Sequence, residues 1–105
     1  MHPNIRAAEG WIELGNYDEA AEELHNCPPA IKSTVEWVKL WVRIYAAQNH
    51  WREVEMMCET LTHHAPEDSF TIFHQAEAWH RQGRSREAFA ALQYAPTNVK
   101  KGAEF

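Results

Sequence analysis

Apolar residues recur along the chain at the spacing of amphipathic helices rather than in the alternation of a half-buried strand. The richest stretch runs from Trp37 to Tyr45, where apolar residues cover more than half of the helix circumference. A helix of this kind is typical of a central element with neighbours on several sides. Six helices are predicted, covering about residues 4–14, 16–27, 33–48, 51–64 and 66–82, with the last running from Glu87 until Pro96. The pattern predicts an all-α fold.

Tight joints connect these helices in pairs. Gly15, Asn49 and Gly83 are spaced by 34 residues, from 15 to 49 and from 49 to 83. Glycine, and among other residues asparagine, tolerates the left-handed conformation that closes a helix. Three joints at one interval predict three helical hairpins in one domain. The predicted repeats cover about residues 1–32, 33–66 and 67–96, which together form the domain 1–96.

Local signals place the ends of the first helices. Asn16 is followed three residues later by Glu19, and Ser33 by Glu36, which is the spacing of a capping box. Pro28–Pro29 is predicted to stop the second helix, because proline removes an amide donor and clashes with the preceding turn.

The C-terminal third also contains local signals, one for the start of a helix and one for a tail. Pro66–Asp68 is predicted as a first helical turn, since proline needs no amide partner there and acids favour the positive end of the helix dipole. Residues 97–105 form a short polar segment, which is predicted to be a flexible tail.

The register of the joints also assigns the interior. It places four aromatic residues in the packed core: Trp11, Trp41, Tyr45 and Trp79. The two cysteines, Cys27 and Cys58, fall within helical apolar patterns and form no CxxC motif. We interpret them as reduced core thiols rather than as a redox pair.

A 34-residue helix–turn–helix period is the signature of the tetratricopeptide repeat, and the chain resembles three consecutive members of that family over about residues 2–96. The resemblance rests on two sets of small residues at equivalent positions, 34 residues apart, in the three repeats. The first set is Ala8, Val42 and Ala76, and the second is Ala20, Val54 and Ala88. Glutamates at 19, 53 and 87 stay in register with them. The resemblance implies an α-solenoid with a right-handed superhelix. Asn4 and Gln75 depart from the family pattern, which favours apolar residues at those positions.

In this family the first helix of each repeat lines a concave groove that binds a peptide of a partner. By that resemblance, the groove here would contain Arg6, Glu9, Ile12, Glu13, Glu36, Lys39, Leu40, Arg43, Phe70, Phe73, His74, Glu77, His80 and Arg81. Any one of these residues also fits an ordinary solvated helix surface. As a set they predict a protein-interaction scaffold whose partner is another protein or peptide.

Basic side chains within this set could hold a carboxylate-bearing peptide: Lys39, Arg43, His74 and Arg81. Some relatives grip the C-terminal carboxylate of a chaperone with Lys and Asn residues. Ile5 and Glu9 occupy the places where the first of those Lys and Asn residues would lie. Chaperone-tail binding is therefore not expected.

An alternative is self-association into a homo-oligomer. Repeat arrays usually end in a polar capping helix, whereas Pro96 stops the last predicted helix and the short tail offers no further one. An apolar surface of Phe89, Leu92 and Tyr94 would then remain for a second copy.

The composition of the chain limits the classes of partner that it can be expected to bind. The chain has 105 residues and a formal net charge of −5, with a pI near 5.8, which argues against nucleic acid because its phosphates require a basic face. The start of the chain lacks a signal-peptide pattern, and no 18-residue apolar run predicts a membrane span. We expect a cytoplasmic protein.

Chemistry-bearing motifs are not evident. Seven histidines include the adjacent pair His63–His64, but neighbouring helical positions point about 100° apart and suit one ion poorly. His74 and His80 are six residues apart rather than three or four. No nucleophile with a base, phosphate loop or zinc spacing is present. Neither an enzyme nor a bound metal or cofactor is expected.

Overall fold

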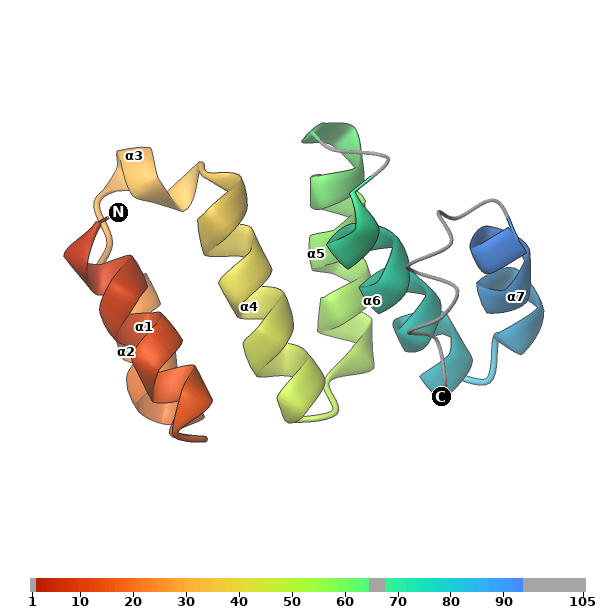
Figure 1. Ribbon diagram of the computed structural model, residues 1–105, viewed down its shortest axis with the longest axis horizontal. Coiled ribbons are helices and arrows are strands. Elements are labelled where there is room, and N and C mark those ends of the chain that lie inside the picture. The colour runs from red at the N-terminus through yellow and green to blue at the C-terminus, as the bar shows by residue number, and fades with distance from the viewer. Residues whose placement is uncertain (1, 65–67, 94–105) are drawn as a thin grey trace.

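The computed structural model describes residues 2–64 and 68–93, and helices make up nearly all of this part of the chain. The helices are α1 (Pro3–Glu13), α2 (Tyr17–His25), α3 (Pro29–Lys32), α4 (Val35–Ala47), α5 (Trp51–His64), α6 (Ser69–Arg81) and α7 (Ser85–Gln93). α1 pairs with α2, α4 with α5, and α6 with α7 (Figure 1). The three hairpins stack in chain order, with α1 and α2 at one end and α7 at the other. The prediction of an all-α fold of helical hairpins is confirmed.

The three joints have the same backbone conformation. Gly15, Asn49 and Gly83 have φ values of 78°, 61° and 82°, all in the left-handed region. In each joint the next amide, at residues 16, 50 and 84, donates to the carbonyl five residues earlier, over 2.8, 2.8 and 2.7 Å. This hydrogen bond closes a helix in the Schellman motif. The 34-residue interval in the sequence therefore marks a real repeat of backbone geometry.

Two helix boundaries differ from the prediction. The cap of α4 is Thr34 rather than Ser33: the Thr34 hydroxyl accepts from the Trp37 amide, whereas the Ser33 hydroxyl donates to a backbone carbonyl. Pro28–Pro29 does end α2, but Pro29 also begins the short helix α3. Proline suits a first helical turn because its fixed φ is already helical.

Other predicted features fall partly beyond the described residues. Asp68 lies at the N-cap position of α6, and the helix begins at Ser69 rather than at residue 66. Pro66, Glu67, Tyr94 and the tail 97–105 lie outside the described residues.

The core forms two adjoining clusters. The first lies between the first hairpin and α4, and its buried members include Leu24 and Trp41, the latter only 6% exposed. The second joins α4, α5 and α6 around Val42, Val54 and Leu61, each fully buried. Of the four aromatic residues assigned to the interior, Trp41 is buried and the other three, Trp11, Tyr45 and Trp79, are half-buried.

Side-chain size explains how the hairpins are spaced. Trp37, Trp41 and Tyr45 form a row of ring contacts along α4, with centroids 5.9 and 5.3 Å apart, and this row fills the space between α4 and the first hairpin. At the next junction the residue of α6 buried in the shared core cluster is the small Ala78, and α5 and α6 pack side by side. Small residues allow two helix backbones to approach.

Candidate functional site

A hollow lies between α1, α3 and the N-terminal end of α4. Its lining combines the apolar side chains of Ile5 and Ile31 with the polar residues His2, Thr34 and Glu36, and its volume is about 250 Å³. Small-molecule sites typically occupy roughly 300–1,000 Å³. The hollow therefore fits one side chain of a partner better than a separate small ligand. α3, which the sequence did not reveal, supplies Ile31 to one of its walls.

The equivalent junction between α4 and α6 is closed by an ion pair. Lys39 Nζ lies 2.8 Å from Asp68 Oδ2 and 5.3 Å from the centre of the Phe70 ring. Burial alone would raise the pKa of Asp68, but hydrogen bonds and charge from Lys39, with hydrogen bonds from Thr71, hold that pKa below its usual value. Lys39, predicted to hold a partner carboxylate, already binds a carboxylate of its own chain.

An aromatic cluster follows along α6. The ring centroids of Phe70 and His74 are 4.4 Å apart, and those of Phe73 and His74 are 5.3 Å apart. His74 Nδ1 is buried and lies 3.4 Å from Glu77 Oε1, without the geometry of a hydrogen bond. Glu77 is itself only 17% exposed at its side chain. The structure thus brings together Lys39, Phe73, His74 and Glu77, which were predicted to share one face.

We call this surface the first-helix face. It comprises His2, Ile31, Thr34, Glu36, Lys39, Asp68, Phe70, Phe73, His74 and Glu77, and the core residue Ile5, 3% exposed, belongs to it only as a wall of the hollow. On the same helices Arg6 and Glu13 are exposed, while Glu9 and Arg43 are half-exposed. The expectation that Ile12 and Leu40 line an open groove is wrong, because both are core residues, 9% and 4% exposed.

Two predicted groove residues at the end of α6 lie elsewhere. The guanidinium of Arg81 lies 5.7 Å from the centre of the Trp51 ring on α5. His80 Nδ1 lies 3.0 Å from the Ser85 hydroxyl at the start of α7. Both side chains therefore contact elements other than α1 and α4.

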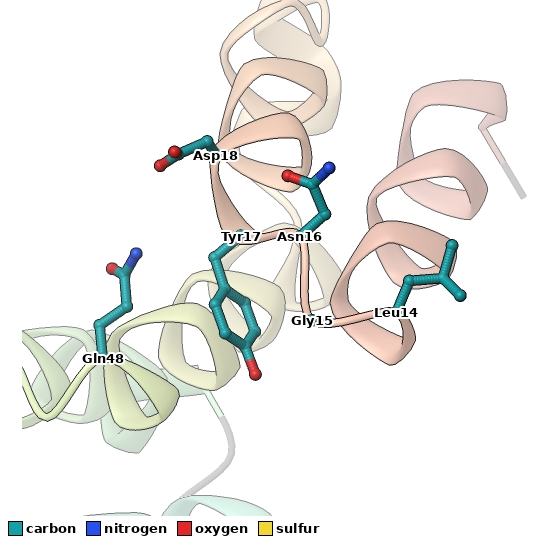
Figure 2. A pocket seen from close by; sticks show the side chains of 6 residues that line it. All are labelled: Leu14, Gly15, Asn16, Tyr17, Asp18 and Gln48. Atoms are coloured by element: carbon teal, nitrogen blue, oxygen red, sulfur yellow. The ribbon is translucent and has the colours of Figure 1, made fainter.

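A larger hollow of about 390 Å³ lies at the first joint, between residues 14–18 and Gln48 at the end of α4. Figure 2 shows the Tyr17 ring between the joint and α4, while the Leu14 side chain points away from Gln48. Asp18 is the one charged side chain of the lining. A single exposed acid beside backbone groups gives little basis for recognising a ligand.

An acidic hub on α5 was not anticipated from the sequence. Glu55 accepts hydrogen bonds from Trp79 Nε1 at 3.2 Å, Gln82 Nε2 at 2.9 Å and Arg84 Nη1 at 2.9 Å. The three donors come from the end of α6 and the joint that follows it. Glu55 thereby fixes the third hairpin on the second, and this is a structural role. No local signal predicts it, because the donors lie 24 to 29 residues away.

Potential metal ligands and cysteines are scattered through the described ranges 2–64 and 68–93. No group of three or more His, Cys, Asp or Glu side chains there is arranged to hold a metal ion. Cys27 and Cys58 are both buried and free, in different core clusters. Burial, with the charge of Glu55 adding to it, raises the pKa of Cys58 to about 12.

Cys58 is therefore expected to resist alkylation or disulfide exchange in the folded protein. With a thiol pKa of about 12, the reactive thiolate at pH 8 is roughly three orders of magnitude scarcer than for a free cysteine. The measurement is the rate of labelling with an aromatic disulfide in a Cys27→Ala variant, folded and in urea. Labelling of the folded variant at the rate seen in urea would contradict the burial of this thiol.

Comparisons with known proteins identified no relative of this chain. No protein-family model matches the chain, and neither curated proteins nor solved structures gave a match. Among the helices that the structure describes, none has both the length and the apolar character needed to cross a bilayer.

Proposed function

We propose that this protein is a protein-interaction scaffold of the tetratricopeptide-repeat kind, which binds a peptide segment of a partner on its first-helix face. The observation that carries the proposal is the hollow between α1, α3 and α4, whose apolar walls include Ile5 and Ile31. The three identical joints and the stacked hairpins support the resemblance to the repeat family. The resemblance to that family supplies the link from the fold to peptide binding.

The chemistry of the face indicates the kind of peptide. An apolar side chain fits the hollow, with Glu36 at its rim to pair with a basic neighbour. Further along α4, Arg43 is half-exposed, and a guanidinium binds carboxylates in a bidentate manner. Lys39 is engaged by Asp68, so Arg43 rather than Lys39 is the cation offered to a partner acid. The expected ligand has an apolar anchor between a basic and an acidic residue.

Selection from a random peptide library tests this proposal. Peptides enriched on the wild-type protein are expected to lose at least about tenfold in affinity for an Arg43→Glu variant, because that change sets like charges against each other. Arg52→Glu is the matched control, since Arg52 is an exposed arginine on α5. Fluorescence anisotropy with labelled peptides measures both. Equal binding by the two variants would reject Arg43 as the cation that binds the partner, and the absence of any enriched peptide would reject the proposal.

A further inference from the structure

The repeat register shows how one hairpin docks on the next. At the junction of the second and third hairpins, Gln82 and Trp79 of the third hairpin donate to Glu55 on α5. Ala78, on the same side of α6, is fully buried in the core cluster that contains Val54 of α5. One stripe of α6 therefore contacts the preceding hairpin.

The first junction uses the same side of α4, with Gln48 exposed at its end. The residues of α4 that stand 34 positions before Ala78 and Gln82 are Ile44 and Gln48. Ile44 is buried in the cluster that contains Leu24 of α2, and the Trp37 indole, on this stripe, donates to the Leu24 carbonyl over 2.9 Å. The corresponding stripe of each first helix thus covers the hairpin before it.

On α1 this stripe is exposed. A further 34 positions earlier stand Gly10 and Leu14, and Leu14 is 77% exposed. Figure 2 shows the Leu14 side chain pointing away from Gln48 and the second hairpin. A Cβ at Gly10 would meet nothing within 4 Å, so another chain has room to approach α1 closely there. Leucine stands where the second and third repeats carry Gln48 and Gln82.

α7 presents the complementary surface at the other end of the stack. Phe89 stands 34 positions after Glu55, the residue that receives the third hairpin. Its side chain is 65% exposed. An aromatic ring on α7 therefore faces the direction in which a following hairpin would dock.

The two ends match each other residue by residue. Inside the molecule, the polar pair Gln82–Glu55 joins two hairpins at 2.9 Å. Continuing the same register beyond α7 would set Leu14 of a second copy against Phe89, replacing a polar pair by an apolar one. Leu14 and Phe89 are two of the three exposed large hydrophobic residues in the described part of the chain, and the third is Met56 on α5.

The charged residues at the two ends of the stack also favour a contact between copies. Inside the molecule, Arg81 lies over Trp51 of the preceding hairpin. The residues equivalent to these two at the open ends are Glu13 on α1 and Ser85 on α7, and Ser85 is flanked by Arg84 and Arg86. Glu13 and Arg86 are both exposed, so their opposite charges would meet.

We propose that this protein associates head to tail, with the α7 end of one copy docked on the α1 end of the next through Phe89 and Leu14. Such a contact is heterologous and leaves one α1 end and one α7 end free on each linear assembly, so the assemblies grow with concentration unless they close into a ring. The end surfaces are separate from the first-helix face, and the proposal stands apart from peptide binding.

Sedimentation velocity over a concentration series up to roughly 1 mM is the first test, since weak contacts appear in that range. The wild type is expected to show a mass that rises with concentration. Leu14→Asp and Phe89→Asp should each lower the association constant at least about tenfold, because either change places a carboxylate in an apolar contact. Met56→Asp is the control at an equally exposed apolar residue, and association should persist.

Mixing the two end variants provides the decisive test. The Leu14→Asp variant keeps an intact α7 end and the Phe89→Asp variant an intact α1 end, so an equimolar mixture is expected to form a one-to-one dimer that neither forms alone. A monomeric wild type at every concentration would overturn the proposal. So would undiminished association of Leu14→Asp, which would indicate a symmetric α7–α7 contact instead. Far-UV circular dichroism verifies that each variant is folded.

Discussion

Trp41→Ala is expected to lower the free energy of unfolding by about 3–5 kcal/mol, the range for removing a large aromatic side chain from a core. Trp41 is 6% exposed and contacts α2 through His25, with ring centroids 5.0 Å apart. It also stacks on Tyr45 and meets Trp37 edge to face along α4. Losing this ring leaves a cavity between the first hairpin and α4, and urea denaturation measures the cost.

The loss of stability caused by Trp41→Ala should be larger in the helices near Trp41 than in the rest of the stack. Each hairpin of a repeat array contacts only its neighbours, so stability is distributed along the stack. Trp41 belongs to the first core cluster, whereas Val54 and Leu61 belong to the second. Hydrogen exchange is therefore expected to show a larger loss of amide protection in α1 and α2 than in α5. An equal loss in all helices would contradict the separation of the two clusters.

Trp41→Phe is the matched control. The indole nitrogen of Trp41 is buried and makes no hydrogen bond within the described part of the chain. Phenylalanine keeps most of the apolar contact and removes a polar group whose burial is uncompensated. This variant should lose less than half of the stability lost by Trp41→Ala. Equal losses would mean that the ring packing contributes little.

Glu55→Ala is expected to lower the free energy of unfolding by about 1.5–3 kcal/mol, the range for hydrogen bonds to a charged group. The Glu55 side chain is 20% exposed and accepts from Trp79, Gln82 and Arg84. Removing it leaves these donors without their acceptor and loosens α6 and the third joint from α5. Thermal and urea denaturation measure the loss, and Glu59→Ala, at an exposed glutamate of α5, is the control.

The same residue predicts a pH dependence. Burial alone would raise the pKa of Glu55, but hydrogen bonds from Gln82, Arg84 and Trp79, with the charge of Arg84, leave it below its usual value. A carboxyl whose pKa is lower when folded stabilises the fold above its unfolded pKa, and this stabilisation is lost as the pH falls through its folded pKa. Wild type should therefore lose more stability than Glu55→Gln when the pH is lowered from about 6 to about 3. Parallel pH profiles would contradict this.

The aromatic row of α4 and the hub at Glu55 show two ways of joining hairpins in one molecule. The first junction depends on large rings, and the second on the small residue Ala78 together with one hydrogen-bonded carboxylate. The proposed junction between copies would use a third combination, Leu14 with Phe89. On sequence grounds Phe89 was predicted, with Leu92 and Tyr94, to contact a second copy, whereas Leu14 was given no such role. The two residues are related through the repeat. Phe89 stands 34 positions after Glu55, and Leu14 stands 68 positions before Gln82, which donates to Glu55.

The sequence alone determined the all-α class, the pairing of helices and the place of each joint, because these depend on local rules. Gly15, Asn49 and Gly83 are read from their own conformational preferences. Local rules failed where one signal has two outcomes: Pro28–Pro29 ends α2 and also begins α3, and either Ser33 or Thr34 suits a cap.

Only the tertiary structure decided which side chains meet across helices. It paired Lys39 with Asp68, placed Arg81 over Trp51 and buried Leu40, although the resemblance to the repeat family had placed Lys39, Arg81 and Leu40 on an open face. The physical reason is that a helix in a stack has neighbours on several sides, so its periodicity indicates which residues share a side but not what covers that side. The neighbours are set by the docking of hairpins, which involves residues far apart in the chain.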